Sequence, residues 1–215
     1  FCWRIWCICG GRSEFPAGPM IGLKRGTVQL VEHQDEWAEE AERTIQELKR
    51  LLGDAAEDIQ HVGSTAIPSI HAKPIIDIAV GVHRLEDIQP YREGLERIGV
   101  IFRGEDVTGQ LLFVKGDFEK DLRTHHIHVV KWRGEAWNHY LQFRDYLIAF
   151  PEKARLYDRE KQRLAAQFPE NRKSYTQGKK EQIDSILREA EKFARRRAGS
   201  PGGEETTIPW RMWST

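Results

Sequence analysis

The sequence predicts an α+β domain in which helices flank a small mixed sheet and a helical cluster follows at the C-terminal end. Two observations carry this prediction. Apolar residues recur every three or four positions in 35–52, and again in three stretches after residue 134, as in amphipathic helices. Short apolar runs without that spacing lie between these helices, and the most continuous of them, 74–82, is typical of a buried strand.

Length and charge fit a single soluble domain. The chain has 215 residues, which is enough for a core without covalent staples. Its 33 basic and 33 acidic residues cancel, so no overall field favours nucleic acid or an anionic membrane as a partner. No apolar run approaches the ~20 residues that span a bilayer. The cysteines, Cys2, Cys7 and Cys9, all lie at one end, so we expect no disulfides in the fold and a reducing, cytoplasmic location.

We expect the folded domain to occupy residues 25–196. Residues 1–24 combine glycines, prolines and scattered aromatics without periodicity, and residues 197–215 are rich in glycine and polar side chains. Both ends are therefore expected to be tails, disordered or non-native. Residues 28–31 alternate weakly and are expected to form a short strand or an extended arm.

The first helix is expected to begin at Asp35, whose side chain can cap it, and to end near Leu52, before Gly53. A strand at 59–62 should follow. It ends at Gly63, which tolerates the backbone geometry of a sharp turn.

The next segment carries an acid in an apolar strand. Pro68 and Pro74 exclude a long helix, so a single helical turn is expected at 65–67. Apart from one glycine, Asp77 alone interrupts the apolar run 74–82. This strand should therefore be central in the sheet and buried on both faces.

A helix should then cover the sheet, capped by Asp87 and with Pro90 in its first turn. Strands are expected at 100–102 and 111–115. The polar residues between them, 103–110, are expected to form a flexible loop.

A further strand is expected at 123–130, followed by three helices at 135–150, 152–168 and 174–196. These three helices form the predicted C-terminal cluster.

Asp77 is the acid on which a functional site would depend. Side chains alternate along a strand, so Ile75, Asp77 and Ala79 share one face. A carboxylate in such a strand rarely lacks a partner. It is either a hydrogen-bonded structural acid or part of a metal or phosphate site, and the preceding turn at Gly63-Ser64 favours the second alternative.

Two histidines can complete the same site. His126 and His128 are two residues apart and project from one face of their strand, whereas His125 points the other way. They are either polar strand residues bonded to helices or partners of Asp77. Imidazole is a poor magnesium ligand and a good ligand for zinc, manganese or iron; it can also serve as a phosphate donor or a general base.

Lysine and arginine side chains that face inward are candidates for binding an anion. Tyr175, Lys179 and Ile183 follow helical i, i+4 spacing, so Lys179 should lean toward the domain. Such cations, Arg123 among them, form either buried ion pairs or a phosphate site.

These residues fall in blocks that resemble the GrpB family, a branch of the nucleotidyltransferase superfamily with the polymerase-β-type catalytic fold. The blocks follow one another over residues 27–194, and they read His61-Val-Gly-Ser-Thr-Ala-Ile-Pro, Ala72-Lys-Pro-Ile-Ile-Asp-Ile, Arg123-Thr-His-His-Ile-His-Val-Val, Phe143-Arg-Asp-Tyr-Leu and Tyr175-Thr-Gln-Gly-Lys.

The resemblance implies a nucleotidyltransferase-like sheet and a mechanism. In that superfamily a Gly-Ser turn binds nucleotide phosphates, and carboxylates on neighbouring strands hold a divalent metal, usually magnesium. The second acid of the superfamily's D-x-D pattern is Ala79 here, which cannot bind a metal. The catalytic and metal-binding candidates are Asp77, His126 and His128; the phosphate- or nucleotide-binding candidates are Gly63, Ser64, Thr65, Lys73, Arg123 and Lys179.

Three functions follow as alternatives. The first is a nucleotidyltransferase-like enzyme that acts on a nucleotide and a small acceptor with magnesium, manganese or zinc. The second, favoured by the loss of the second acid, is a non-catalytic module that binds a nucleotide or a CoA-like phosphate. The third is a transition-metal hydrolase that uses Asp77, His126 and His128.

Overall fold

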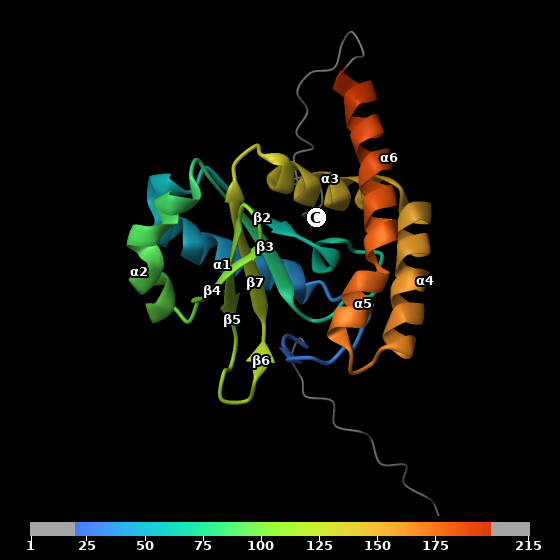
Figure 1. Ribbon diagram of the computed structural model, residues 1–215, viewed down its shortest axis with the longest axis horizontal. Helices are drawn as coiled ribbons and strands as arrows, with labels where there is room; N and C mark the ends of the chain where they lie inside the picture. The colour runs from blue at the N-terminus through green and yellow to red at the C-terminus, as the bar shows by residue number, and fades with distance from the viewer. Residues whose placement is uncertain (1–19, 199–215) are drawn as a thin grey trace, which may run out of the picture.

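The computed structural model describes residues 20–198, which form a five-stranded mixed sheet with helices on both faces (Figure 1). Only the β3–β7 pair is parallel, and the other pairs are antiparallel. This arrangement confirms the predicted α+β class. In spatial order the strands are β2 (Asp58–Val62), β3 (Ile76–Val82), β7 (His125–Lys131), β5 (Gln110–Lys115) and β4 (Ile101–Val107).

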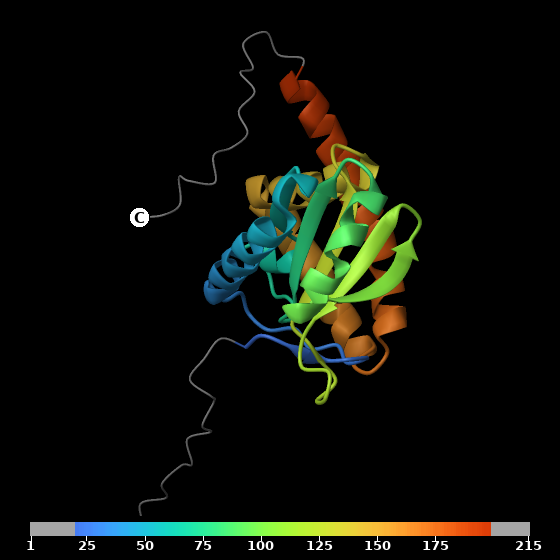
Figure 2. The same cartoon turned by 90° about the vertical axis from the view of Figure 1, so that its left-hand side faces the viewer.

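The main core lies between one face of the sheet and two helical segments, α1 (Glu36–Leu52) and the η3–α2 segment (Leu85–Arg97). Figure 2 shows α2 in front of the sheet and α6 behind it. Trp37 and Leu48 of α1 are fully buried there. The predicted helix at 35–52 is confirmed as α1, although the Asp35 side chain makes no capping hydrogen bond. The predicted buried strand is confirmed as β3, which begins at Ile76, two residues after Pro74.

The opposite face of the sheet packs against α3 (Glu135–Ala149), through Trp137 and the strand residues Val62, Ala79 and Val130. Beside α3 lie α4 (Pro151–Gln167), α5 (Arg172–Gly178) and α6 (Lys180–Ala198) (Figure 1). Asp77 shares its strand face with Ala79 and therefore points toward this helical side.

The predicted flexible loop at 103–110 is wrong, because β4 continues through Val107 and forms a hairpin with β5. The turn is tight, and Gly109 adopts a positive φ of 80° there. The register of β4 shifts twice, between Phe102 and Gly104 and between Glu105 and Val107. These shifts interrupt the alternation of side chains, so the sequence of the strand shows no period of two.

The predicted helix at 174–196 is two helices, α5 and α6, which meet at Gly178 and Lys179. Gly178 packs so closely on α4 that a Cβ there would lie 2.7 Å from Leu164 Cδ2. α5 also begins earlier than predicted, because the Asn171 side chain accepts a hydrogen bond from Ser174 N (3.0 Å).

The helix predicted to be capped by Asp87 begins earlier, as the 3₁₀ segment η3 (Leu85–Tyr91) that continues into α2 (Arg92–Arg97). Asp87 lies inside that segment and accepts a hydrogen bond from Arg84 N (3.0 Å). The rigid φ of Pro90 is accommodated in the 3₁₀ segment, ahead of α2.

The fold also begins before residue 25. Strand β1 (Leu23–Lys24) pairs antiparallel with β6 (Leu122–Arg123), and Trp37 Nε1 donates a hydrogen bond to Met20 O (3.1 Å). Residues 20–24 therefore belong to the domain, contrary to the expected tail. The extended arm at 28–31 forms only an isolated bridge, Val31 with Ala72.

The rest of the two expected tails, 1–19 and 199–215, lies outside the described residues. No helix within residues 20–198 combines the length and the apolar character needed to cross a bilayer.

Candidate functional site

The site is built on the parallel pair β3–β7, whose register places Asp77 beside His126 and Ala79 beside His128. Asp77 Oδ1 lies 3.1 Å from His126 Nδ1 and 3.6 Å from His128 Nε2. His125 points to the other face, where its Nε2 lies 3.1 Å from Thr44 Oγ1. The structure thus brings together the three residues predicted to share a site.

Arg172 fixes the tautomer of His126. Its Nη2 lies 3.4 Å from His126 Nε2, and a guanidinium can only donate hydrogen bonds. His126 Nε2 is therefore the acceptor, and the ring carries its proton on Nδ1. That Nδ1–H group donates to Asp77 Oδ1. Arg172 was absent from the sequence-based candidates, since α5 was expected to begin after it.

Gln110 orients His128 in a similar way. The Tyr140 hydroxyl donates to Gln110 Oε1 (2.8 Å), which leaves the Gln110 amide nitrogen to donate to His128 Nδ1 (3.2 Å). His128 then carries its proton on Nε2, the nitrogen that faces Asp77. As bonded here, both imidazoles present N–H groups to one carboxylate oxygen.

The two histidines determine the charge state of Asp77. Burial alone raises its pKa, but the hydrogen bonds from His126 and His128 outweigh burial and hold the pKa well below its usual range. Burial is also the largest influence on His126 and lowers its pKa, with Asp77 opposing. At neutral pH the site therefore contains an ionised Asp77 carboxylate beside a neutral His126 imidazole.

Gly63 allows the turn after β2 to press against Asp77. Its backbone adopts φ 73° and ψ −167°, a region that is essentially restricted to glycine. A Cβ at this position would lie 2.6 Å from Asp77 Oδ2 and 2.9 Å from Asp77 Cβ. The predicted turn follows as η2 (Ser64–Ala66), and Ser64 hydrogen-bonds the hydroxyl of buried Tyr157 on α4.

Thr65 is one of the predicted phosphate-binding residues, and its hydroxyl has partners inside the protein. Thr65 Oγ1 donates to Ile75 O (3.5 Å) and lies 3.0 Å from His61 Nε2. The side chain is buried. In this arrangement Thr65 ties the turn to the residue before β3, and its role in phosphate binding stays a prediction.

Two lysines from distant segments lie close to the Tyr175 ring. Lys73 Nζ is 5.6 Å and Lys179 Nζ is 4.6 Å from the ring centroid. Within residues 20–198 neither ammonium has a carboxylate at ion-pair distance. Burial, with a contribution from Arg172, lowers the pKa of Lys73 to about 7 and that of Lys179 to about 8, although Asp77 opposes both shifts.

Arg123 is bound within its own segment. It donates from Nη1 to Leu122 O (3.2 Å), and its Nη2 lies 3.5 Å from Asp121 Oδ1. Its guanidinium also stacks 4.7 Å from the Phe118 ring centroid. Its role in phosphate binding stays a prediction, although its charge is close enough to lower the pKa of Arg172.

A buried polar network holds the segment between Gly63 and β3 against α4. Asp158 accepts hydrogen bonds from His71 N, from His71 Nδ1 and from Gln162 Nε2, each at 2.8 Å. Lys161, 1% exposed, donates to His71 O. Helical spacing contained a signal for this network, because Asp158 and Lys161 lie on the apolar face of α4.

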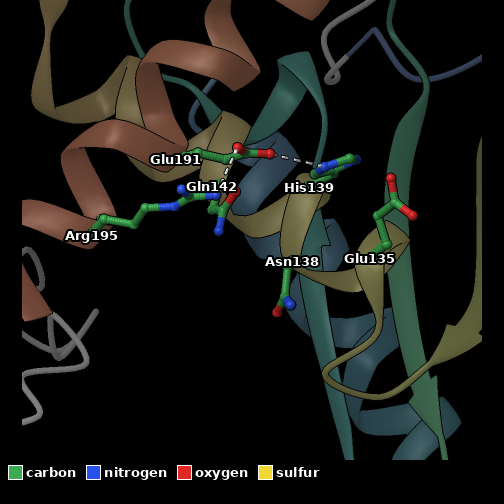
Figure 3. Close-up of a pocket in the computed structure, with 7 residues that line it drawn as sticks. Glu135, Asn138, His139, Gln142, Glu191 and Arg195 are labelled. Atoms are coloured by element: carbon green, nitrogen blue, oxygen red, sulfur yellow. Dashed lines mark ion pairs between the residues drawn. The ribbon is translucent and has the colours of Figure 1, made fainter.

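A separate pocket of about 240 Å³ lies between α3 and α6 (Figure 3). Glu191 lies at its centre and pairs with His139 (3.6 Å) and Arg195 (3.7 Å). None of the predicted site residues lines it.

The donor set at Asp77 fits a transition metal better than magnesium. One ligand atom from each of Asp77, His126 and His128 lies within 4.8 Å of the others. Asp77 Oδ1 lies 3.1 Å from His126 Nδ1 and 3.6 Å from His128 Nε2. Both distances are close to the ~3.3 Å that separates two ligand atoms of a tetrahedral zinc ion. Two imidazoles and one carboxylate suit zinc, manganese or iron, provided that His126 Nδ1 and His128 Nε2 both give up their protons.

The chain is similar to known proteins over most of its length. A family model described as GrpB protein matches residues 27–189. The glutamate-rich protein GrpB of Alkalihalophilus pseudofirmus is 39% identical over 173 residues, which are 79% of this chain and 99% of that protein. The UPF0157 protein YqkA of Bacillus subtilis is 35% identical over 81% of this chain and 50% of its own length. The crystal structure of GrpB from Enterococcus faecalis superimposes with a TM-score of 0.72 and 33% identity, over 78% of this chain and 99% of that one.

Proposed function

We propose, on the premise that this chain belongs to the GrpB family, that the Asp77 site binds a nucleotide or another phosphorylated small molecule together with a divalent metal. With a nucleoside triphosphate, a hydroxyl of a small acceptor would attack the α-phosphorus, so that a nucleoside monophosphate is transferred, pyrophosphate leaves and the hydroxyl proton passes to solvent. One observation carries the proposal. Two half-buried lysines, Lys73 and Lys179, lack carboxylate partners within the described chain and lie near the ionised Asp77. A phosphate between the lysines and a metal on Asp77 would satisfy both charges.

The lysines supply the attraction for the anion. Burial disfavours their charged forms, and a bound phosphate would stabilise those forms and raise the pKa of both lysines. Phosphate should therefore bind most tightly where both lysines already carry their protons. Gly63 permits the turn to approach Asp77 closely, and Ser64 follows Gly63 in the chain. In this proposal Lys73 and Lys179 bind the phosphate, and Ser64 orients it.

Asp77, His126 and His128 would hold the metal, which when bound neutralises phosphate charge. As the hydrogen bonds stand, neither ring presents a lone pair toward Asp77. His128 must therefore lose its proton from Nε2, and His126 must lose its proton from Nδ1, before either ring can act as a ligand. If the His126 proton moves to Nε2, Arg172 loses its acceptor there. The metal-bound arrangement thus requires Arg172 to find another partner, for which a phosphate is suited.

Thermal unfolding with nucleoside triphosphates and magnesium, manganese or zinc tests the proposal. A ligand at a hundred times its Kd should add ~2.7 kcal/mol of stability, a rise of roughly 5–10 °C in Tm for a domain of this size. Lys73→Met and Lys179→Met should abolish that rise, while Lys49→Met, on the far end of α1, should keep it. If no nucleotide with any of these metals raises the Tm or is consumed, the proposal fails.

The alternative of a non-catalytic phosphate-binding module is favoured by Ala79, which shares the face of Asp77 and leaves the strand with one acid. It predicts nucleotide binding without metal and with unchanged affinity in Asp77→Asn, measured by calorimetry. The transferase predicts instead that Asp77→Asn loses turnover and metal-dependent affinity.

A transition-metal hydrolase would use the same three side chains, and the suitability of imidazole for zinc, manganese or iron favours it. Elemental analysis of protein purified without a His-tag separates it from the other two functions. Stoichiometric zinc, manganese or iron would support it, and their absence would exclude it.

A further inference from the structure

A second pocket, of about 730 Å³, lies next to the Asp77 site on the other side of Arg172. It is formed by the turn after β1 and by residues of α5 and α6. We call it the Arg25 pocket after one of its cations. Its volume is within the range of 300–1,000 Å³ that is common for small-molecule sites.

The Arg25 pocket is strongly cationic. Four of its lining side chains are basic and none is acidic: Arg25, Arg172, Lys173 and Lys180. Lys180 pairs with Asp184 outside the pocket (2.6 Å). Arg25 and Lys173 have no ion-pair partner in the part of the chain that the structure describes. The pocket therefore presents positive charge that the described protein does not neutralise.

Two of the lining cations, Arg25 and Arg172, are guanidinium groups that come from segments far apart in the chain. Within the described chain no carboxylate lines the pocket beside them. A phosphate suits such a pocket because guanidinium groups bind phosphate in a bidentate manner.

The position of Arg172 connects the two sites. It lines the Arg25 pocket and also donates to His126 Nε2 at 3.4 Å. An anion on its pocket side would thus be separated from the His126–Asp77 pair by a single guanidinium. This position is suitable for a second substrate if the first is held by Lys73 and Lys179.

We infer that the Arg25 pocket binds the acceptor, and that the acceptor is a phosphomonoester or a similar small dianion. The role as acceptor rests on the proposed function, whereas dianion binding does not depend on it. Thr176 and Gln177, which also line the pocket, offer neutral hydrogen-bonding groups for the remainder of such a molecule.

Calorimetry with glycerol phosphate as the probe tests the inference, at low salt and neutral pH. Arg25→Gln and Lys173→Gln should each weaken binding about tenfold, as expected for loss of a charged hydrogen bond. Both side chains are exposed, so neither change should lower the Tm. Arg188→Gln is the matched control, because Arg188 is an exposed cation on α6 that does not line the pocket.

The site of binding is distinguished by a second pair of variants. Lys73→Met and Lys179→Met should leave glycerol phosphate binding intact, since these residues do not line the Arg25 pocket. If they abolish it while Arg25→Gln and Lys173→Gln do not, or if the wild-type protein shows no binding at about millimolar probe, the inference is overturned. If the protein binds glycerol phosphate but no nucleotide, the proposed function is wrong, whereas dianion binding in the Arg25 pocket is supported.

Discussion

Gly63→Ala tests the close approach on which the candidate site depends. Gly63 has a positive φ of 73°, and an added Cβ would lie 2.6 Å from Asp77 Oδ2 and 2.9 Å from Asp77 Cβ. The backbone conformation alone costs roughly 1–3 kcal/mol for a residue other than glycine. Overpacking against buried β3 adds about 1–3 kcal/mol, because its backbone cannot move away. We expect the free energy of unfolding to fall by about 2–6 kcal/mol in total.

Urea unfolding and calorimetry measure this loss. At about 2–4 °C per kcal/mol, the Tm should fall by roughly 4–24 °C. Gly99→Ala is the matched control, since Gly99 also has a positive φ, 78°, but nothing lies within 4 Å of an added Cβ. It should lose only the backbone contribution, about 1 kcal/mol. The reasoning is refuted if the two variants unfold within about 0.5 kcal/mol of each other.

Three further outcomes are expected. Asp158→Ala removes the acceptor for both His71 nitrogens and should cost about 3–5 kcal/mol of stability in urea unfolding; a loss under ~1 kcal/mol would show that the network is not structural. The pKa values of Lys73 and Lys179 in the folded protein, about 7 and about 8, lie below that of lysine in the unfolded chain. The free energy of unfolding should therefore rise as pH increases from about 7 to about 10, because only the unfolded chain holds these protons in that range. Phosphate affinity, measured by calorimetry, should change in the opposite direction and fall between about pH 6 and pH 9; a flat profile would exclude these lysines as the anion site. Asp77→Ala should weaken zinc or manganese binding by more than about tenfold in a competition assay with a chelating dye, and unchanged affinity would place the metal elsewhere.

The sequence by itself determined most of the elements and the faces that carry the chemistry. The period of two along a strand was enough to separate His126 and His128 from His125, because side-chain alternation is a local property of the backbone. The period of 3.6 identified the long helices for the same reason. Local signals failed where the backbone was irregular, as in β4, where two register shifts removed the alternation.

Only the tertiary structure decided which of these faces meet. The parallel register that places Asp77 beside His126 joins residues 49 positions apart and is set by packing on both faces of the sheet. The tautomer of His126 depends on Arg172, which lies in α5. A single helix was expected at 174–196, so Arg172 was not placed in a helix from the sequence. Residues so far apart in the chain produce no periodic pattern that would show them to be partners. The carboxylate, the imidazoles and the lysines could therefore be named as candidates from the sequence. Their hydrogen bonds and charge states follow only from the fold.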